Sequence, residues 1–424
     1  MLDLKWIREN PDLCRKGLTS KNSKIDLDEL LKLDRERRTF IQEVEDLKAK
    51  RNAANEDVTR LKKEGQNQQA NDLITSLKSI SQKIKEIDVK VEEISLKIGN
   101  ITYIIPNMPH ETVPIARGTE GNKIVRSWGE PKKFSEKPKD HLQIGSERGW
   151  LNMEWGSKIA GSGFPVYTYF GARLERALIN FMLDMHSTKH GYSEMWPPAL
   201  VNRQSMTGTG QLPKFEEDMY RLKEDDYFLI PTAEVPVTNL LRDEVLEEKN
   251  LPIKFTAYSP CFRREAGSYG KDTKGLSRVH QFDKIEMVKF SKPEDSLNEL
   301  ESLVRNAEAV LQALELHYRV VLLGSGDLSF SAAKCYDLEA WAPATEKWFE
   351  VSSCSTFMDF QSRRMNLKFR REKTSKTEYV HTLNGSGVAL ARVVLCLLEN
   401  VQPKDDSPEQ FPKALRPYLK NLAE

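Results

Sequence analysis

Hydrophobic residues between positions 30 and 101 follow a repeat that is typical of a long coiled coil. The seam advances by alternating steps of three and four residues, first through Leu30, Leu33, Arg37, Phe40, Val44, Leu47, Arg51, Ala54, Val58 and Leu61, and then through Ala70, Leu73, Leu77, Ile80, Ile84, Ile87, Val91, Ile94, Ile98 and Ile101. The break at residues 64–67 is short, and Pro106 and Pro109 end the second series. The pattern therefore predicts an antiparallel helical hairpin whose first helix, over about 27–63, is about 55 Å long.

A different pattern begins near residue 164, where apolar helical stretches alternate with short β-rich runs. It predicts helices over 171–190, 294–315 and 388–400, and strands over 227–230, 255–258, 285–290, 318–323 and 336–340. Because these elements do not form regular βαβ units, they favour an antiparallel or mixed sheet of the α+β class. We expect a helical arm domain over 1–105, a polar linker leading into the second domain over 106–160, and a main domain over 161–424.

Composition excludes disorder, because 39% of the 424 residues are hydrophobic and the net charge is only +1. That near-neutrality argues against a generally basic nucleic-acid coat protein but leaves local patches open. Residues 48–63, towards the predicted hairpin tip, hold six basic and two acidic residues. The arm is therefore either a solvated spacer or dimerisation coiled coil, which charge alone favours, or a surface that contacts nucleic-acid phosphates.

The cysteines and histidines predict neither disulfides nor a metal site. Five cysteines lie far apart without a CxxC pair, which is typical of reduced thiols in a cytoplasm. His186 and His190 have i,i+4 spacing but lack the Glu of an HExxH pattern, so we expect them simply to lie on a helix face. The N-terminus has no apolar core of a secretory signal, and no stretch approaches about 18 apolar residues. We expect a soluble cytoplasmic protein with no membrane association.

Two basic residues flank a glycine-rich segment in the main domain. The run 261–268 ends a predicted strand and enters a loop containing Gly267, Ser268, Gly270 and Gly275, and the chain continues through 278–286. Arg263 and Arg278 could together bind a polyphosphate, since Arg donates in pairs to phosphoryl oxygens. A charged β-hairpin with a long loop contains the same residue types, and the residues alone do not separate the two interpretations.

Two further segments contain residue types suited to nucleotide binding. Residues 384–392 combine alternating small side chains with Arg392, as in a strand-to-helix turn that a ligand approaches closely. Residues 350–353 could supply a carboxylate and a hydroxyl to Mg²⁺, or could form an ordinary strand edge.

In this order the segments resemble the three motifs of class II aminoacyl-tRNA synthetases, and the whole chain resembles the bacterial type of seryl-tRNA synthetase. Motif 1 is similar to the predicted helix 171–190 with residues 191–198, motif 2 to the Phe-Arg-x-Glu run, and motif 3 to the stretch ending in Arg392. The Pro-Asn-x-x-His linker at 106–110 and the Thr-Ala-Glu tripeptide at 232–234 are similar to features of the seryl enzymes.

The resemblance implies a class II catalytic domain, built on an antiparallel sheet of six to eight strands flanked by helices, together with the coiled-coil arm. It also implies an ATP-dependent serine–tRNA ligase. Serine and ATP would form seryl-adenylate and pyrophosphate, and the seryl group would then pass to the 3′-terminal ribose of serine tRNA. Catalysis would rest on positioning and charge neutralisation, without a covalent enzyme nucleophile.

The resemblance further implies which residues bind ATP. Arg263, as the catalytic residue, would bridge the α-phosphate and the serine carboxylate. Glu265 would contact the adenine end, and Arg278 would hold the γ-phosphate. Phe282 and Arg392 would stack on opposite faces of the adenine. The remaining ATP-binding residues would be Arg264, Val279, Glu350, Val351, Ser352 and Ser353.

Serine and Mg²⁺ are expected in the same site. Glu350 and Ser353 would ligate Mg²⁺, and no zinc is expected. The serine pocket would hold the amino group with Thr232, Ala233 and Glu234, and the hydroxyl with Glu286 and Ser386. A buried acceptor left without its hydrogen bond would reject alanine, and a tight pocket would reject threonine.

The implied partners are tRNA and a second subunit. Residues 27–101 would clamp the long variable arm of serine tRNA by shape and backbone contacts, as is common for RNA duplexes. Whether selenocysteine tRNA is also charged stays open. The family forms homodimers through motif 1, and two-fold dimers are the commonest closed assembly.

Some positions depart from the family pattern or leave alternatives open. Arg264 stands where serine is more typical, Ala389 replaces a glycine of motif 3, and residues 115–120 differ from the expected linker. The basic run 363–376 could guide acceptor-stem phosphates or coat a strand pair, and we favour the second. An amino-acid:carrier-protein ligase would not need the long arm. A scaffold with an inactive synthetase domain would not need the complete set of site residues.

Overall fold

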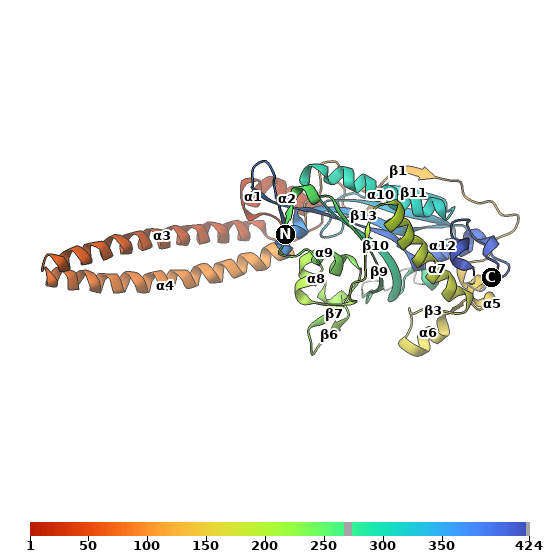
Figure 1. The fold of residues 1–424 in the computed structure, drawn as a ribbon, viewed down its shortest axis with the longest axis horizontal. Helices are drawn as coiled ribbons and strands as arrows, with labels where there is room; N and C mark the ends of the chain where they lie inside the picture. The colour runs from red at the N-terminus through yellow and green to blue at the C-terminus, as the bar shows by residue number, and fades with distance from the viewer. Residues whose placement is uncertain (267–273, 421–424) are drawn as a thin grey trace. The chain divides into compact units, whose positions relative to one another are not determined.

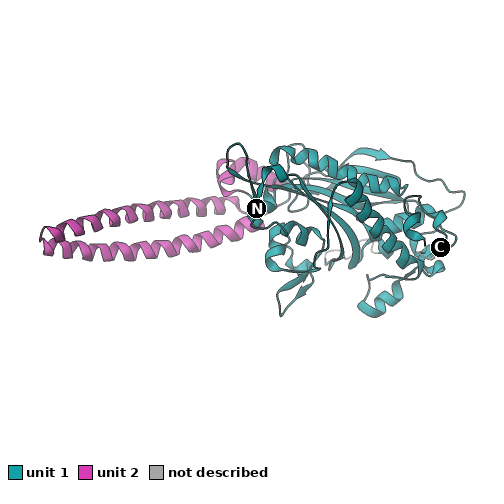
Figure 2. Ribbon diagram, in the orientation of Figure 1, with its two compact units in different colours: residues 1–2, 20–22, 106–424 teal, residues 3–19, 23–105 magenta. Residues whose placement is uncertain are grey.

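The computed structural model describes residues 1–266 and 274–420, which form two compact units (Figure 2). The arm unit consists of residues 3–19 and 23–105, and the sheet unit of residues 1–2, 20–22 and 106–424. Each is described by itself. The predicted loop glycines Gly267 and Gly270, together with Ser268, lie outside the described residues.

The arm unit confirms the predicted hairpin. Helix α3 (Leu27–Lys63) runs antiparallel to α4 (Asn67–Ile104), and the two lie side by side along their length (Figure 1). Asp26 begins α3 because its carboxylate accepts hydrogen bonds from the free amides of Asp28 and Glu29. Two short helices, α1 (Leu4–Glu9) and α2 (Pro11–Ser20), precede the hairpin.

The hairpin is held together by its seam. Val44, Ile84 and Ile87 are buried where the predicted heptads meet, as expected for knobs packed into holes. Across the rim, Lys83 Nζ lies 2.8 Å from a Glu43 oxygen. The outer faces stay polar and exposed, so the hairpin buries mainly its own seam.

The sheet unit is built on one eight-stranded sheet, which bears out the expected α+β class. In spatial order the strands are β1 (Lys123–Trp128), β11 (Tyr318–Leu322), β12 (Lys334–Ala342), β13 (Lys347–Met358), β16 (His381–Ala389), β10 (Gln281–Ser291), β9 (Ile253–Phe262) and β4 (Ser193–Met195). Every neighbouring pair is antiparallel except β4 and β9, which are parallel. The predicted strand at 227–230 instead belongs to a small sheet, as β7 (Tyr227–Leu229).

Three helices cover one face of the large sheet and form the main core with it (Figure 1). They are α7 (Phe170–Asp184), α10 (Ser296–Ala313) and α12 (Leu390–Val401), and each was predicted within a few residues. Leu178, Val304 and Leu397 from these helices are completely buried against apolar side chains of the strands. The opposite face of the sheet carries the polar residues described below.

The segment predicted as a linker contains structure that the sequence did not reveal. Strand β1 forms one edge of the large sheet, pairing with β11, although all six of its residues are exposed. Helix α5 (His141–Arg148) follows in the same segment. Edge strands and short helices bury few apolar side chains, so their hydrophobic pattern is weak.

The remaining elements are short. The other helices are α6 (Met153–Ala160), α8 (Arg203–Thr209), α9 (Glu234–Asn239), α11 (Phe360–Met365) and α13 (Arg416–Leu419). Three small sheets pair β5 (Leu200–Asn202), β7 and β6 (Arg221–Leu222); β15 (Thr377–Tyr379), β14 (Lys368–Arg370) and β8 (Val245–Glu247); and β2 (Leu151–Asn152) with β3 (Val166–Tyr167). All five cysteines are free, in line with the predicted thiols, and the structure adds that all five are buried. In the described part of the chain, no helix combines the length and apolarity needed to cross a membrane.

Candidate active site

Strands β10 and β16 present one set of side chains to the helices and another to the opposite face. Ile285 and Met287 of β10 join the core beneath the helices, and the alternation of a strand turns Glu286 to the other side. Ser386 lies directly opposite Glu286 in the β10–β16 ladder. The candidate residues from the two motifs thus meet on the face that no long helix covers.

Thr232 and Glu286 are joined in a buried cluster. Thr232 Oγ1 donates to a Glu286 carboxylate oxygen at 2.9 Å and accepts from the backbone amide of Glu234 at 3.1 Å. Ala233 lies between Thr232 and Glu234 in the chain. Ala233 and Glu286 are both completely buried. The structure therefore brings the four residues from the separate segments 232–234 and 278–286 into one polar pocket.

Three residues that the sequence analysis missed complete this pocket. Lys284 Nζ donates to Thr232 Oγ1 at 2.8 Å and also pairs with Glu286. Asn384 Nδ2 donates to Glu286 at 2.9 Å, and Gln361 Nε2 donates to Glu234 at 2.7 Å. Lys284 and Asn384 could have been found, because each stands two residues before a predicted site residue on the same strand face.

Electrostatics make Glu234 unusual among the carboxylates of the pocket. Burial, followed by the nearby Glu286 carboxylate, raises the pKa of Glu234 to about 7. The hydrogen bond from Gln361 and the charges of Lys284 and Arg263 act in the opposite direction. A bound cation would relieve the repulsion between the two carboxylates.

A second pocket opens beside this cluster and collects the predicted nucleotide-binding residues. Its walls contain Arg263, Glu265, Leu276, Ser277, Arg278, Val279, Phe282, Lys284, Glu350, Val351, Ser352, Ser386, Ala389 and Arg392. The Arg263 guanidinium lies 5.1 Å from the centre of the Phe282 ring, close enough for a cation–π contact. Arg278 forms an ion pair with Glu265. Lys284, which bonds to Thr232, and Ser386, which pairs with Glu286 in the ladder, both line this pocket, so the buried cluster lies against its wall.

Arg392 connects the walls of the nucleotide pocket. Its Nη1 donates to the Glu350 carbonyl at 2.7 Å, and its Nε donates to the Ser277 carbonyl at 3.1 Å. Ser352 Oγ donates to the Ser386 carbonyl at 2.6 Å, which ties β13 to β16. Arg392 and Ser386 both belong to the segment that is similar to motif 3. Through these bonds the segment holds the neighbouring wall of the nucleotide pocket in place.

Arg264 does not join its neighbours in the pocket. It follows the end of β9, in a segment without strand structure, and its Nη1 donates to the Glu217 carbonyl at 2.8 Å. Its side chain is exposed and is absent from the pocket walls described above. The sequence motif alone could not separate it from Arg263 and Glu265.

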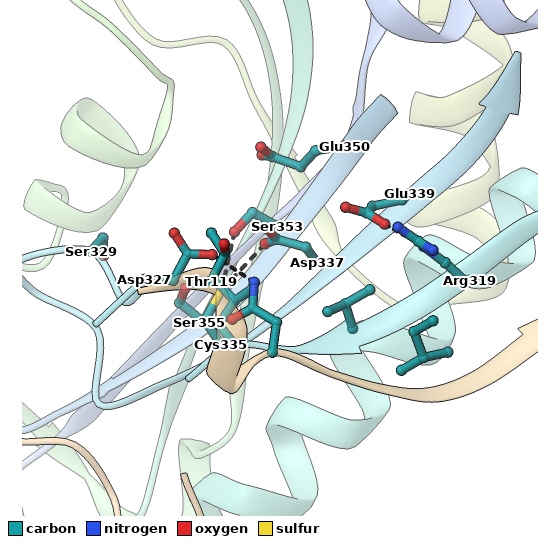
Figure 3. Close-up of a pocket in the computed structure, with 14 residues that line it drawn as sticks. Thr119, Arg319, Asp327, Ser329, Cys335, Asp337, Glu339, Glu350, Ser353 and Ser355 are labelled. Carbon is teal, nitrogen blue, oxygen red and sulfur yellow. Dashed lines mark hydrogen bonds and ion pairs between the residues drawn. The ribbon is translucent and has the colours of Figure 1, made fainter. Parts of the chain in front are cut away.

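Glu350 and Ser353, the expected Mg²⁺ ligands, both line a larger cavity of about 660 Å³ next to the nucleotide pocket (Figure 3). Figure 3 shows Asp337 and Cys335 on β12 beside Ser353, and the Cys335 sulfur lies 3.1 Å from Ser353 Oγ. Burial, and then Glu350, raise the pKa of Asp337 well above its ordinary value.

The donors of this cavity suit a hard cation that arrives with its own ligands. Carboxylate and hydroxyl oxygens are the ligands Mg²⁺ prefers, usually together with water and phosphate oxygens. Within residues 1–266 and 274–420, no three His, Cys, Asp or Glu side chains are grouped to enclose a metal.

The histidine pair and the basic run 363–376, the candidates not yet placed, contact other residues of the fold. His186 lies in the π-helical turn that continues α7, where burial lowers its pKa to about 4 and Nε2 lies 3.0 Å from the Gly387 carbonyl. His190 Nδ1 lies 2.9 Å from His186 Nδ1. In the basic run, Arg371 pairs with Glu294 at 2.6 Å and with Glu378 at 2.7 Å.

Comparison with known proteins matches both parts of the chain to family descriptions. Residues 1–109 match the seryl-tRNA synthetase N-terminal domain, and residues 214–401 match the class II tRNA synthetase core domain (G, H, P, S and T). The chain is 55% identical to the serine–tRNA ligase of Caldanaerobacter subterraneus over 99% of this chain and 98% of that protein.

Solved structures give the same result. A seryl-tRNA synthetase from Pyrococcus horikoshii in complex with ATP has a TM-score of 0.92 at 36% identity, covering 99% of this chain and 98% of that one. The cytoplasmic serine–tRNA ligase of Naegleria fowleri in complex with AMP has a TM-score of 0.86 at 30% identity, covering 99% of this chain and 97% of that one.

Proposed function

The chain belongs to the seryl-tRNA synthetases, and we propose that it attaches L-serine to serine tRNA through a seryl-adenylate intermediate. The observation that carries the proposal is the buried pair of carboxylates, Glu234 and Glu286, joined to Thr232 beside the nucleotide pocket. Such a pocket has acceptors for an ammonium group and for a hydroxyl within reach of a phosphate-binding wall.

Serine binding follows from the partners of the two carboxylates. The substrate ammonium pairs with Glu234, and the hydroxyl engages Glu286 and Ser386, which face each other across the ladder. Glu286 is completely buried and already accepts from Thr232 and Asn384, so a serine hydroxyl can join this hydrogen-bonded network, whereas a methyl group cannot. This discriminates against alanine by the loss of a hydrogen bond rather than by size.

Adenylation needs only positioning and charge neutralisation. A serine carboxylate oxygen attacks the α-phosphorus of ATP, a new P–O bond forms, and the bond to the β-phosphate oxygen breaks to release pyrophosphate. Arg263 bridges the two reacting anions. Arg278 exchanges Glu265 for a terminal phosphate, because one guanidinium cannot serve both anions with all its donors.

Mg²⁺ is the cation we propose for the neighbouring cavity. When bound with ATP it neutralises phosphate charge as a Lewis acid, and Glu350 and Ser353 hold it there. Glu350 also pairs with Arg392 at 3.4 Å, so this carboxylate connects the metal position with the adenine wall.

The arm unit has the length and polar faces for binding the long variable arm of serine tRNA. Selenocysteine tRNA is a second candidate substrate. We further propose a cytoplasmic homodimer that assembles through α7 and the strand after it, the region similar to motif 1. The arm of one subunit would then serve a tRNA whose acceptor end enters the partner's site.

Serine-dependent ATP–pyrophosphate exchange tests the proposal directly. Exchange with serine, and little with alanine or threonine, is the expected result. Exchange with a different amino acid instead would refute the serine assignment. Charging of serine tRNA in the same preparation separates the ligase from an enzyme that passes the acyl group to a carrier protein, since only the ligase would label tRNA.

A further inference from the structure

One buried histidine supports the nucleotide pocket without lining it. His141 is the first residue of α5, in the segment whose sequence predicts only a linker. Its side chain is 4% exposed, and it is absent from the pocket walls. A buried imidazole needs partners for both ring nitrogens, and both are present here.

The two nitrogens of His141 hold different segments of the chain. The backbone amide of Leu276 donates to Nε2 at 3.2 Å, while Nδ1 lies 3.1 Å from a Glu399 oxygen. An amide N–H can only donate, so Nε2 carries the lone pair. The ring proton therefore lies on Nδ1 and is donated to Glu399, which fixes both the tautomer and the orientation of the ring.

Glu399 is itself held firmly. It lies on α12, is completely buried, and accepts from the backbone amides of Ala344 at 3.0 Å and Thr345 at 3.1 Å with its other oxygen. Hydrogen bonds to a buried carboxylate are among the stronger ones in proteins. His141 is thus a rigid connection between the body of the unit and Leu276.

Leu276 belongs to the stretch that leads into Arg278. The short 3-10 turn η5 (Gly275–Ser277) lies directly before that residue, and Leu276, Ser277 and Arg278 all line the nucleotide pocket. Gly275 has a φ of +65°, and a methyl group there would come within 2.2 Å of His141 Nε2. Only glycine therefore allows the close approach. From the pocket side, Arg392 holds the Ser277 carbonyl, so the turn is fixed on both sides.

We propose that His141 is a positioning residue for ATP: it fixes the turn over 275–277 and thereby sets where Arg278 enters the nucleotide pocket. This inference rests on the proposed assignment of Arg278 to an ATP phosphate. Loss of the Leu276 bond frees the turn and weakens ATP binding. The serine pocket, built on β10, β16 and residues 232–234, has no bond to His141 and keeps its affinity.

Two substitutions at this position separate the two nitrogens. His141→Asn places its amide nitrogen near Nδ1, so it keeps a donor for Glu399 but has no acceptor for Leu276. His141→Gln places an amide oxygen near Nε2 and keeps that acceptor. His317→Asn serves as a control, because His317 contacts the Trp128 carbonyl at the sheet edge instead.

The measurements are the KM values for ATP and serine in serine-dependent exchange, and hydrogen–deuterium exchange of the Leu276 amide. His141→Asn should raise the KM for ATP about tenfold, equivalent to about 1.4 kcal/mol, because a buried amide loses its partner. The KM for serine and kcat should change less than about twofold, and the Leu276 amide should exchange faster. His141→Gln should stay within about threefold of the wild type for ATP.

An unchanged KM for ATP in His141→Asn would overturn the proposal. Equal increases in the KM values for ATP and serine would also overturn it, as would a His141→Gln variant whose KM for ATP rises as much as that of His141→Asn. If His141→Asn does not fold, Gly275→Ala tests the same contact from the other side, and a normal ATP affinity would then refute it. Should the wild type show no serine-dependent exchange, the proposed function fails. Calorimetric ATP binding and Leu276 amide exchange would still test the role of His141.

Discussion

Lowering the pH should weaken serine binding because Glu234 changes charge near neutrality. Its pKa is raised to about 7 by burial and by Glu286. Free amino acids keep their ammonium group through this range, so the bound serine needs Glu234 in its carboxylate form. At that pKa the ionised fraction is about one-eleventh at pH 6 and about ten-elevenths at pH 8. The KM for serine should therefore be about tenfold higher at pH 6 than at pH 8.

The assay is serine-dependent ATP–pyrophosphate exchange at saturating ATP and Mg²⁺, measured across this pH range at constant ionic strength. Glu234→Gln should bind serine weakly at every pH and lose the pH dependence. Gln361→Leu removes a hydrogen bond that favours the ionised form, so it should move the midpoint above pH 7. A flat wild-type profile, or the same slope in Glu234→Gln, would refute the reasoning.

Four further outcomes follow from the same structure. Arg263→Ala should lower exchange at least about 100-fold without changing the thermal midpoint, whereas near-normal exchange would contradict its role between two anions. Replacing residues 27–101 by a short Gly/Ser linker should spare exchange but abolish most tRNA charging, and equal loss of both would make the arm a support for the catalytic fold. Glu350→Gln should raise the Mg²⁺ concentration needed for half-maximal exchange several-fold, while an unchanged requirement would remove Glu350 from the metal site. Because folding raises the pKa of Glu234 from 4.5 to about 7, the protonated form favours the folded state, so wild type without serine should lose stability relative to Glu234→Gln as the pH rises from about 4.5 to about 7 and change little above it. Identical melting profiles would argue against that pKa.

The parts of the fold that bury a periodic apolar surface were predictable from the sequence. The arm seam repeats over two long helices, and α7, α10 and α12 each bury one face in the core, so their patterns are strong. Strand β1 and helix α5 gave no such signal because they bury few apolar side chains. The place of β1 depends on pairing with β11, about 200 positions later, and that of α5 on the contact of His141 with Glu399.

The residues of the candidate site also fall into two groups, those that the sequence could suggest and those that only the fold brings together. Residue type made Arg263 and Arg392 candidates with alternatives left open, and Glu286 was assigned through the resemblance of its motif to the family. Gln361 and Asp337 stand in none, and only the folding of α11 and β12 brings them to the site. Arg264 shows the converse: it stands inside a motif, but its guanidinium bonds to the Glu217 carbonyl and it does not line the pocket, which the motif alone could not reveal.

The position of β16 in the sheet determines when during synthesis the enzyme can become active. It is the last strand in the chain, yet it lies in the middle of the sheet, between β13 and β10. A nascent chain that ends before residue 381 can form β1, β11, β12 and β13 on one side, and β10, β9 and β4 on the other, without a strand to join them. Chains are made from the N-terminus at about 5–20 residues per second, so this central strand is the last of the eight to become available. Because β16 also carries Asn384 and Ser386, the serine pocket is completed by the same event that closes the sheet. A chain that ends before β16 would therefore lack the proposed serine site, and a chain that ends before α12 would also lack Arg392.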